Sequence, residues 1–204
     1  MSAAQGITRA QLLMAGLALA LPAGARAATS TTNTTGIPQE GDPGYDPLTP
    51  ADREAVKFLI DLEELQLAVY RHAATVPLSA PVQRFAAQAL VRERRHRAIL
   101  LRLQRDRSVI ANRPRIYAFN AGDDATFLTL ASRVEEAVVQ GYNGVIVLLD
   151  EAESLSPILA PIAVDEATHA GAVRVLQGQD PVLYSFDDPK TRNSIAPILG
   201  SPEG

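Results

Sequence analysis

Two copies of one short pattern contain the residues of this sequence that are best suited to chemistry. Each copy has a glutamate followed seven residues later by a tyrosine, and then a glutamate followed three residues later by a histidine. The copies are Glu63, Tyr70, Glu93 and His96, and Glu135, Tyr142, Glu166 and His169. The two glutamates of a copy are 30 residues apart in the first and 31 in the second. The sequence therefore contains an internal repeat.

These spacings suit α-helices. Residues three apart project from the same helix face, so each Glu-x-x-His pair converges on one point. Residues seven apart differ by about 20° of rotation, so each tyrosine lies two turns along the stripe of its glutamate. Apolar residues such as Ala89, Leu100, Leu159 and Val173 share the stripes of the two pairs. We therefore expect both pairs to face a core, where unpaired charge is very costly.

Four glutamates in a core need compensating charge. Two divalent cations would balance four carboxylates, and two neutral imidazoles would complete the ligand set. Oxygen ligands combined with imidazole suit iron or manganese, with zinc or cobalt as substitutes. A single Glu-x-x-His is a weak signal, but glutamate makes up only 11 of 204 residues. The chance that two of three histidines carry a glutamate at this spacing is below about one in a hundred.

Several neighbouring residues have other interpretations. Glu64 and Glu136 are rotated by about 100° from the predicted ligands, so we expect them to face outward. His72 lies off the stripe and is interpreted as a solvated surface histidine. Asp165 is a candidate to orient a metal-bound histidine. Gly141 and Gly144, inside a predicted helix, indicate close helix packing or a π-bulge.

A dense arginine run occupies the second helical block. It comprises Arg92, Arg94, Arg95, Arg97, Arg102, Arg105 and Arg107. No aromatic residues interleave with it, and the formal net charge of the chain is −4, so nucleic-acid binding is not predicted. We expect a charged outer face that pairs with Asp61, Glu64 or Glu136.

Start and stop signals predict four helices. The first helix is predicted to begin at Thr49-Pro50 and end near Ala74, and the second to begin at Ser79-Ala80-Pro81 and end near Arg107. The third is capped by Asp123-Asp124 and ends near Leu149. The fourth is predicted to begin at Ser156-Pro157 and end near Gly178. The short connections indicate that the first two helices, and the last two, are antiparallel neighbours. The middle loop, 108–121, reaches about 45 Å when extended. A helix of about 27 residues is roughly 40 Å long, so this loop can cross the whole bundle.

The two ends of the chain are predicted to lie outside this bundle. Arg9, an apolar run over 10–21 and Ala25-Arg26-Ala27 are typical of a secretory signal peptide over residues 1–27. Residues 28–50 are predicted as a flexible linker, 51–178 as the bundle and 179–204 as an irregular tail. The predicted location is periplasmic or secreted, by a Sec or Tat-like route, with no membrane span after cleavage.

Composition narrows the chemistry further. The absence of cysteine excludes disulfides, thiolate metal sites and thiol nucleophiles. The length fits one domain with tails. A homo-oligomer is compatible with the sequence, which does not indicate the number of subunits.

At these residues the sequence resembles the ferritin-like superfamily, and more narrowly the exported bacterial ferritin-like proteins that include the desiccation-related group. The resemblance covers about residues 52–178. Its most specific stretches are Asp61-Leu62-Glu63-Glu64-Leu65 with Tyr70, the segment from Glu135 to Gly144, and Asp165-Glu166-Ala167-Thr168-His169-Ala170. It implies an all-α ferritin-like four-helix bundle, built from two helix hairpins joined by one long crossover, with a two-metal centre.

The resemblance also implies ligand positions and an activity. The implied metal ligands are Glu63, Glu93, His96, Glu135, Glu166 and His169, for two divalent metal ions, Fe or Mn. Of these, Glu93 and Glu166 would bridge the metals. Tyr70 and Tyr142 are catalytic candidates that would hydrogen-bond a ligand carboxylate or relay an electron; a core role with a satisfied hydroxyl is the alternative.

Two functions follow for this arrangement. The first is redox activity on O2, peroxide or Fe(II), of the ferroxidase, peroxidase or catalase type. The second is a non-enzymatic structural or stress-protective bundle, in which the metal site is stabilising or absent.

Overall fold

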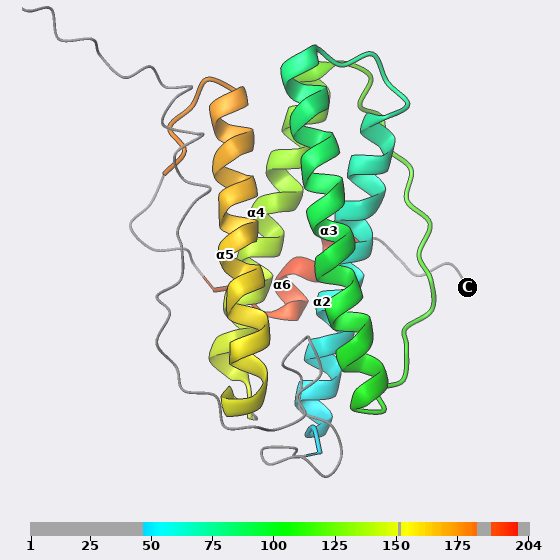
Figure 1. Ribbon diagram of the computed structural model, residues 1–204, viewed down its shortest axis with the longest axis vertical. Coiled ribbons are helices and arrows are strands. Elements are labelled where there is room, and N and C mark those ends of the chain that lie inside the picture. The colour runs from blue at the N-terminus through cyan, green and yellow to red at the C-terminus, as the bar shows by residue number, and fades with distance from the viewer. Residues whose placement is uncertain (1–46, 151, 183–188, 200–204) are drawn as a thin grey trace, which may run out of the picture. The chain divides into compact units, whose positions relative to one another are not determined.

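The computed structural model describes residues 47–150, 152–182 and 189–199 of the chain. Four long helices, α2 (Pro50–Ala73), α3 (Ala80–Asp106), α4 (Asp124–Leu148) and α5 (Ala152–Leu176), are followed by α6 (Arg192–Ile195) and the 3-10 helix η1 (Ala196–Leu199) (Figure 1). These described ranges contain no strand, so the all-α prediction is confirmed. The predicted signal peptide, and the predicted linker up to residue 46, lie outside them.

The starts of α2 and α4 follow from their capping residues. The Thr49 side chain accepts a hydrogen bond from the backbone N–H of Asp52 at 3.1 Å, and Pro50 occupies the first turn of α2. At α4, the Asp123 side chain accepts a hydrogen bond from the backbone N–H of Thr126 at 2.8 Å. The Thr126 hydroxyl in turn accepts one from the backbone N–H of Asp123 at 3.2 Å. Both helices begin where the sequence predicts.

The predicted start of the fourth helix is wrong. Helix α5 begins at Ala152, before the predicted Ser156-Pro157, and it contains both Pro157 and Pro161. A proline inside a helix removes one backbone hydrogen bond and costs roughly 3 kcal/mol. Leu155 and Leu159, which flank Pro157 and are fully buried, contribute apolar burial that offsets this cost.

The four helices form two hairpins. Helix α2 packs against α3, and α4 packs against α5. The hairpins join mainly between α2 and α4, and α3 also contacts α5. A single crossover between α3 and α4 runs along the bundle (Figure 1), as the loop length predicts.

The crossover is attached to α2. Asn112 donates a hydrogen bond to Asp61 at 2.9 Å, and Arg115 lies 3.5 Å from the same carboxylate. Farther along, Nε2 of His72 lies 2.8 Å from the carbonyl oxygen of Ala121. His72 is therefore half-buried and bonded to the crossover rather than fully solvated, and it lies outside the predicted metal-ligand cluster. Asp61 pairs with the crossover rather than with the arginine run of α3.

Part of the predicted irregular tail folds onto α4. The backbone N–H of Lys190 donates to the carbonyl oxygen of Gln140 at 3.1 Å. A Cβ at Gly144 would lie 1.9 Å from the Lys190 carbonyl oxygen, so only glycine permits this approach. Ile195 and Leu199, in α6 and η1, are buried. Of the predicted alternatives, close helix packing is observed at Gly141, where a Cβ would lie 2.8 Å from Leu62 of α2, whereas Gly144 is approached by the tail segment instead of a helix.

Within the part of the chain that the structure describes, the helices are too short or too polar to cross a membrane.

Candidate metal centre

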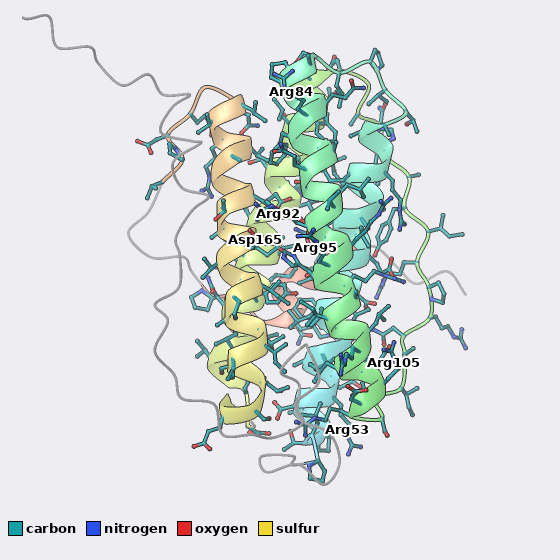
Figure 2. All side chains as sticks on the ribbon, viewed as in Figure 1. Arg53, Arg84, Arg92, Arg95, Arg105 and Asp165 are labelled. Carbon is teal, nitrogen blue, oxygen red and sulfur yellow. The ribbon has the colours of Figure 1, made fainter. Side chains whose placement is uncertain are left out.

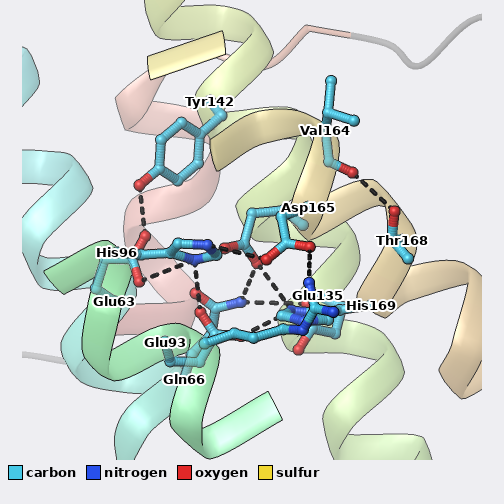
Figure 3. Close-up of polar contacts among 12 residues, drawn as sticks. Glu63, Gln66, Glu93, His96, Glu135, Tyr142, Val164, Asp165, Thr168 and His169 are labelled. Atoms are coloured by element: carbon cyan, nitrogen blue, oxygen red, sulfur yellow. Dashed lines mark hydrogen bonds and ion pairs between the residues drawn. The ribbon is translucent and has the colours of Figure 1, made fainter. Parts of the chain in front are cut away.

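Each of the four long helices contributes to one buried cluster (Figure 3). Glu63 comes from α2, Glu93 and His96 from α3, Glu135 from α4, and Glu166 and His169 from α5. All four glutamates are 0% exposed, and the histidines are 6% and 4% exposed. The structure therefore brings all six predicted ligands together at the centre of the bundle.

The cluster divides into two overlapping groups. The first contains Glu63, Glu93, His96 and Glu166, and the second contains Glu93, Glu135, Glu166 and His169. Within each group, one potential ligand atom per residue lies within 4.8 Å of the others. Glu93 and Glu166 belong to both groups, which is where bridging carboxylates would stand. We refer to the groups as the His96 half-site and the His169 half-site.

The two imidazoles present the same atom to the cluster. Nδ1 of His96 lies 2.7 Å from Oε1 of Glu166 and 3.1 Å from Glu93. Nδ1 of His169 lies 2.8 Å from Oε1 of Glu93. Each histidine therefore reaches the glutamate of the opposite hairpin, which ties the hairpins together at this level.

The tyrosines also act across the hairpins. The Tyr70 hydroxyl donates to Oε1 of Glu135, and the Tyr142 hydroxyl donates to Oε1 of Glu63. Burial and the adjacent glutamate raise the pKa of each tyrosine well above its usual value, so both hydroxyls keep their protons. Of the predicted alternatives, contact with a ligand carboxylate is the observed one. The sequence places each tyrosine on the stripe of its own glutamate, but each bonds the glutamate of the other repeat.

Without metal, protons balance part of the cluster's charge. Burial, followed by repulsion from Glu166, raises the pKa of Glu63 and of Glu135 well above the ordinary value. Burial lowers the pKa of His96, but bonds to Asp165 and Glu166 outweigh it and raise this pKa to about 12. Bonds to Glu166 and Glu93 likewise raise the pKa of His169 to about 11. Burial opposes ionisation of Glu166, yet bonds to both histidines lower its pKa to about 2.

The cluster fits divalent metal ions. Oε2 of Glu63 makes no hydrogen bond, and Oε1 of Glu93 and Oε1 of Glu166 face the Nδ1 atoms of His169 and His96 at 2.8 and 2.7 Å. Four carboxylates gathered in a core are costly without compensating charge, and hard divalent cations are partners that suit their oxygens. The cluster is therefore compatible with a di-metal site of the carboxylate type.

Two further side chains contact the predicted ligands. Oδ2 of Asp165 lies 3.1 Å from Nε2 of His96, the position expected for a residue that orients a ligand histidine. Gln66, fully buried, donates from Nε2 to Oε2 of Glu135 at 3.1 Å and to Oε2 of Glu166 at 2.5 Å. Sequence reasoning missed Gln66. A signal was present, because an amide occupies an otherwise apolar helical stripe three residues after Glu63.

The neighbouring charged residues face outward. Glu64 pairs with Arg97 of α3, as predicted, but Glu136 pairs with Arg174 of α5 rather than with the arginine run. Arg92 pairs with Asp165 across α3 and α5 (Figure 2). The arginine run is therefore only partly neutralised by the predicted acids.

A groove between α3 and α5 reaches the edge of the cluster. Its volume is about 640 Å³, and its lining includes Arg92, Arg95, His96, Ile99, Ile162 and Asp165. Arg92 and Arg95 lie on the side of α3 that faces α5 (Figure 2). The groove ends at His96 and Asp165, and none of the four cluster glutamates lines it.

Comparison with known proteins agrees with this architecture. The family model described as "Ferritin-like domain" matches residues 51–179, which span α2 to α5. The chain therefore belongs to the ferritin-like domain family. No curated protein matches the chain.

Proposed function

We propose that this chain is an exported di-metal carboxylate protein that uses iron or manganese in redox chemistry on O2 or peroxide. Ferroxidase, peroxidase and catalase reactions are the candidate types, with O2, peroxide or Fe(II) as the small substrate. The observation that carries the proposal is the pair of four-residue half-sites that share Glu93 and Glu166 in a fully buried core. Two adjacent metal positions are the arrangement used by two-metal redox and hydrolytic centres.

The roles of the protein groups follow from their contacts. The six predicted ligands would hold two metal ions, which would relay electrons from Fe(II) or a peroxide molecule to the oxidant when bound. Tyr70 and Tyr142 hold Glu135 and Glu63 in place and keep a proton beside each carboxylate. Asp165 orients His96. The groove between α3 and α5, which ends at His96 and Asp165, would bring a small oxidant to the edge of the cluster.

The first test is metal content. We expect protein isolated from its native compartment to contain about two equivalents of iron or manganese by elemental analysis. A Glu93→Gln/Glu166→Gln double variant keeps the side-chain volumes but removes both shared carboxylates, so it should lose the metal. Glu64→Gln is the matched control, because Glu64 neighbours Glu63 and pairs outward with Arg97. Circular dichroism establishes that each variant is folded.

The second part of the test is reactivity. Metal-loaded protein should decompose peroxide or oxidise Fe(II), and the double variant should do neither. A folded chain that carries no metal, and whose double variant is equally stable, would overturn the di-metal proposal. Metal binding without either reaction would instead favour the structural or stress-protective alternative.

Export is part of the proposal and rests on the sequence of residues 1–27. N-terminal sequencing of protein from the periplasmic or secreted fraction should begin at Ala28. An intact N-terminus in the cytoplasm would overturn this part without affecting the metal centre.

A further inference from the structure

We propose that the two half-sites bind metal unequally, with the His96 half-site filled first and the His169 half-site acting as the weaker, exchanging position. This inference rests on the proposed di-metal function. It comes from comparing equivalent positions of the internal repeat, which differ just outside the six predicted ligands.

The first difference concerns the histidines. Nε2 of His96 faces the Asp165 carboxylate at 3.1 Å. Nε2 of His169 is buried and has no hydrogen-bond partner. The residue that precedes Glu93 is Arg92, whereas Asp165 precedes Glu166, so the repeat supplies one carboxylate instead of two. A carboxylate behind a ligand histidine fixes the ring and makes it a better donor.

The second difference concerns the unshared glutamates. Tyr142 bonds one oxygen of Glu63, and the other, Oε2, makes no hydrogen bond. Both oxygens of Glu135 are engaged, one by Tyr70 and the other by Gln66. Glu63 therefore offers a metal a carboxylate oxygen that makes no hydrogen bond and lies 3.9 Å from Nδ1 of His96, whereas Glu135 must give up a hydrogen bond.

Gln66 is the origin of this difference. It also donates to Oε2 of Glu166, the oxygen nearer His169, so it occupies two acceptors of the His169 half-site. The equivalent position of the second repeat, 72 residues later, is Val138, which is fully buried and cannot donate. Both differences favour the His96 half-site. Loss of one such supporting contact typically changes metal affinity by about 10–100-fold.

The test is an anaerobic titration of metal-free protein with Co²⁺, followed by calorimetry and by visible absorption. We expect two binding steps of one equivalent each, with affinities that differ by about 10–100-fold. Glu63→Gln should remove the tight step, and Glu135→Gln should remove the weak one. These two variants assign the steps without any activity measurement.

Two more variants test the proposed cause. Gln66→Val copies the Val138 environment and should tighten the weak step. Asp165→Asn should weaken the tight step and leave the weak one unchanged. Glu64→Gln, which alters an outward-facing carboxylate, should change neither step. The matched substitutions preserve approximate volume, and circular dichroism checks that each variant is folded.

The outcomes separate this inference from the proposed function. Two equal steps in the natural chain, or loss of the weak step in Glu63→Gln, would overturn the inference and leave the di-metal site intact. A weak step unchanged in Gln66→Val would overturn the role of Gln66. No Co²⁺ binding by the natural chain would overturn the di-metal function itself.

Discussion

The α2–α3 and α4–α5 hairpins have the same residues facing the cluster but different residues around it. Glu63 and Glu135, and Tyr70 and Tyr142, lie 72 positions apart, and the Glu-x-x-His pairs lie 73 apart. One layer farther out the repeat breaks down, because Gln66 faces the cluster from α2 whereas the equivalent residue of α4 is Val138. This difference shows that the repeat preserves the ligand positions while the residues that support the ligands differ.

The outer surfaces of the hairpins differ as well. Helix α2 is covered by the crossover, which contacts His72. The equivalent position of α4 is Gly144, against which the backbone at Lys190 lies. Helices α2 and α4 are therefore covered by different segments, and the absence of a side chain at Gly144 permits the close approach of Lys190.

The largest expected effect separates shared from unshared ligands. Glu93→Gln removes a carboxylate that belongs to both half-sites, so we expect loss of both metal equivalents. Glu63→Gln and Glu135→Gln each alter one half-site, so each should lose only one equivalent. Elemental analysis after desalting measures this. Equal losses in all three variants would show that the half-sites do not behave as separate units.

The second prediction concerns pH. Folding raises the pKa of His96 to about 12 and of His169 to about 11, so the metal-free folded state retains protons that the unfolded state releases above about pH 6.5. The stability that these protons supply is complete below that pH and is lost as pH rises toward the folded pKa values. Glu63 and Glu135, whose folded pKa values are also raised, act in the same direction above about pH 4.5.

Urea unfolding of the metal-free protein at pH 6, 7 and 8 tests this prediction. Each retained proton reduces the free energy of unfolding by up to about 1.4 kcal/mol per pH unit. Metal replaces these protons, so the metal-loaded protein should have a flatter profile and should release protons on loading. Metal-free stability that increases over this range would contradict the charge balance derived for the cluster.

The third prediction concerns the covering of α4. Gly144→Ala would place Cβ 1.9 Å from the Lys190 carbonyl oxygen, so the segment leading to α6 must move. We expect a loss of about 1–3 kcal/mol in the free energy of unfolding, as for other overpacked sites. Gly171→Ala is the control, because its Cβ would meet Pro181 at an ordinary 3.5 Å and alanine favours a helix. Thermal unfolding measures Tm of both variants. An equal decrease in Tm would contradict the idea that the close approach of Lys190 makes Gly144→Ala destabilising.

Most of the bundle could be predicted from the sequence because its signals are local. Caps such as Thr49 and Asp123 mark helix starts, and the spacing of Glu63, Tyr70 and the Glu-x-x-His pairs identifies the stripes that meet in the core. The predicted start of α5 was wrong because the local sequence around Pro157 does not show whether the proline lies in the first turn of a helix or farther inside it. Only tertiary burial of Leu155 and Leu159 distinguishes these cases.

The parts that sequence reasoning missed depend on contacts between distant segments. Gln66 is an ordinary polar residue until α4 and α5 bring Glu135 and Glu166 to its amide. The fold of the tail depends on the space above Gly144. Periodicity within one helix places Gln66 on the buried stripe but carries no information about a partner on another helix, so neither its hydrogen bonds nor the fold of the tail could be deduced from spacing.

The smallest predicted effects concern the outward carboxylates beside Glu63 and Glu135. Glu64 pairs with Arg97, and Glu136 lies 3.3 Å from Arg174. Partly exposed ion pairs contribute about 0–1 kcal/mol, so Glu64→Gln and Glu136→Gln should each change the free energy of unfolding by less than about 1 kcal/mol. Neither variant should change metal content. Urea unfolding and elemental analysis measure both properties.

A difference between these two variants sharpens the comparison of the hairpins. The Arg174 side chain is 11% exposed and that of Arg97 is 37% exposed, so Arg174 is screened less by water. Glu136→Gln should therefore cost more than Glu64→Gln. The repeat equivalent of Arg97 is Ala170, one helical turn before Arg174, so each hairpin makes the same helix-to-helix pairing from a different position. Equal costs would mean that burial of the arginine has no effect on the strength of the pairing.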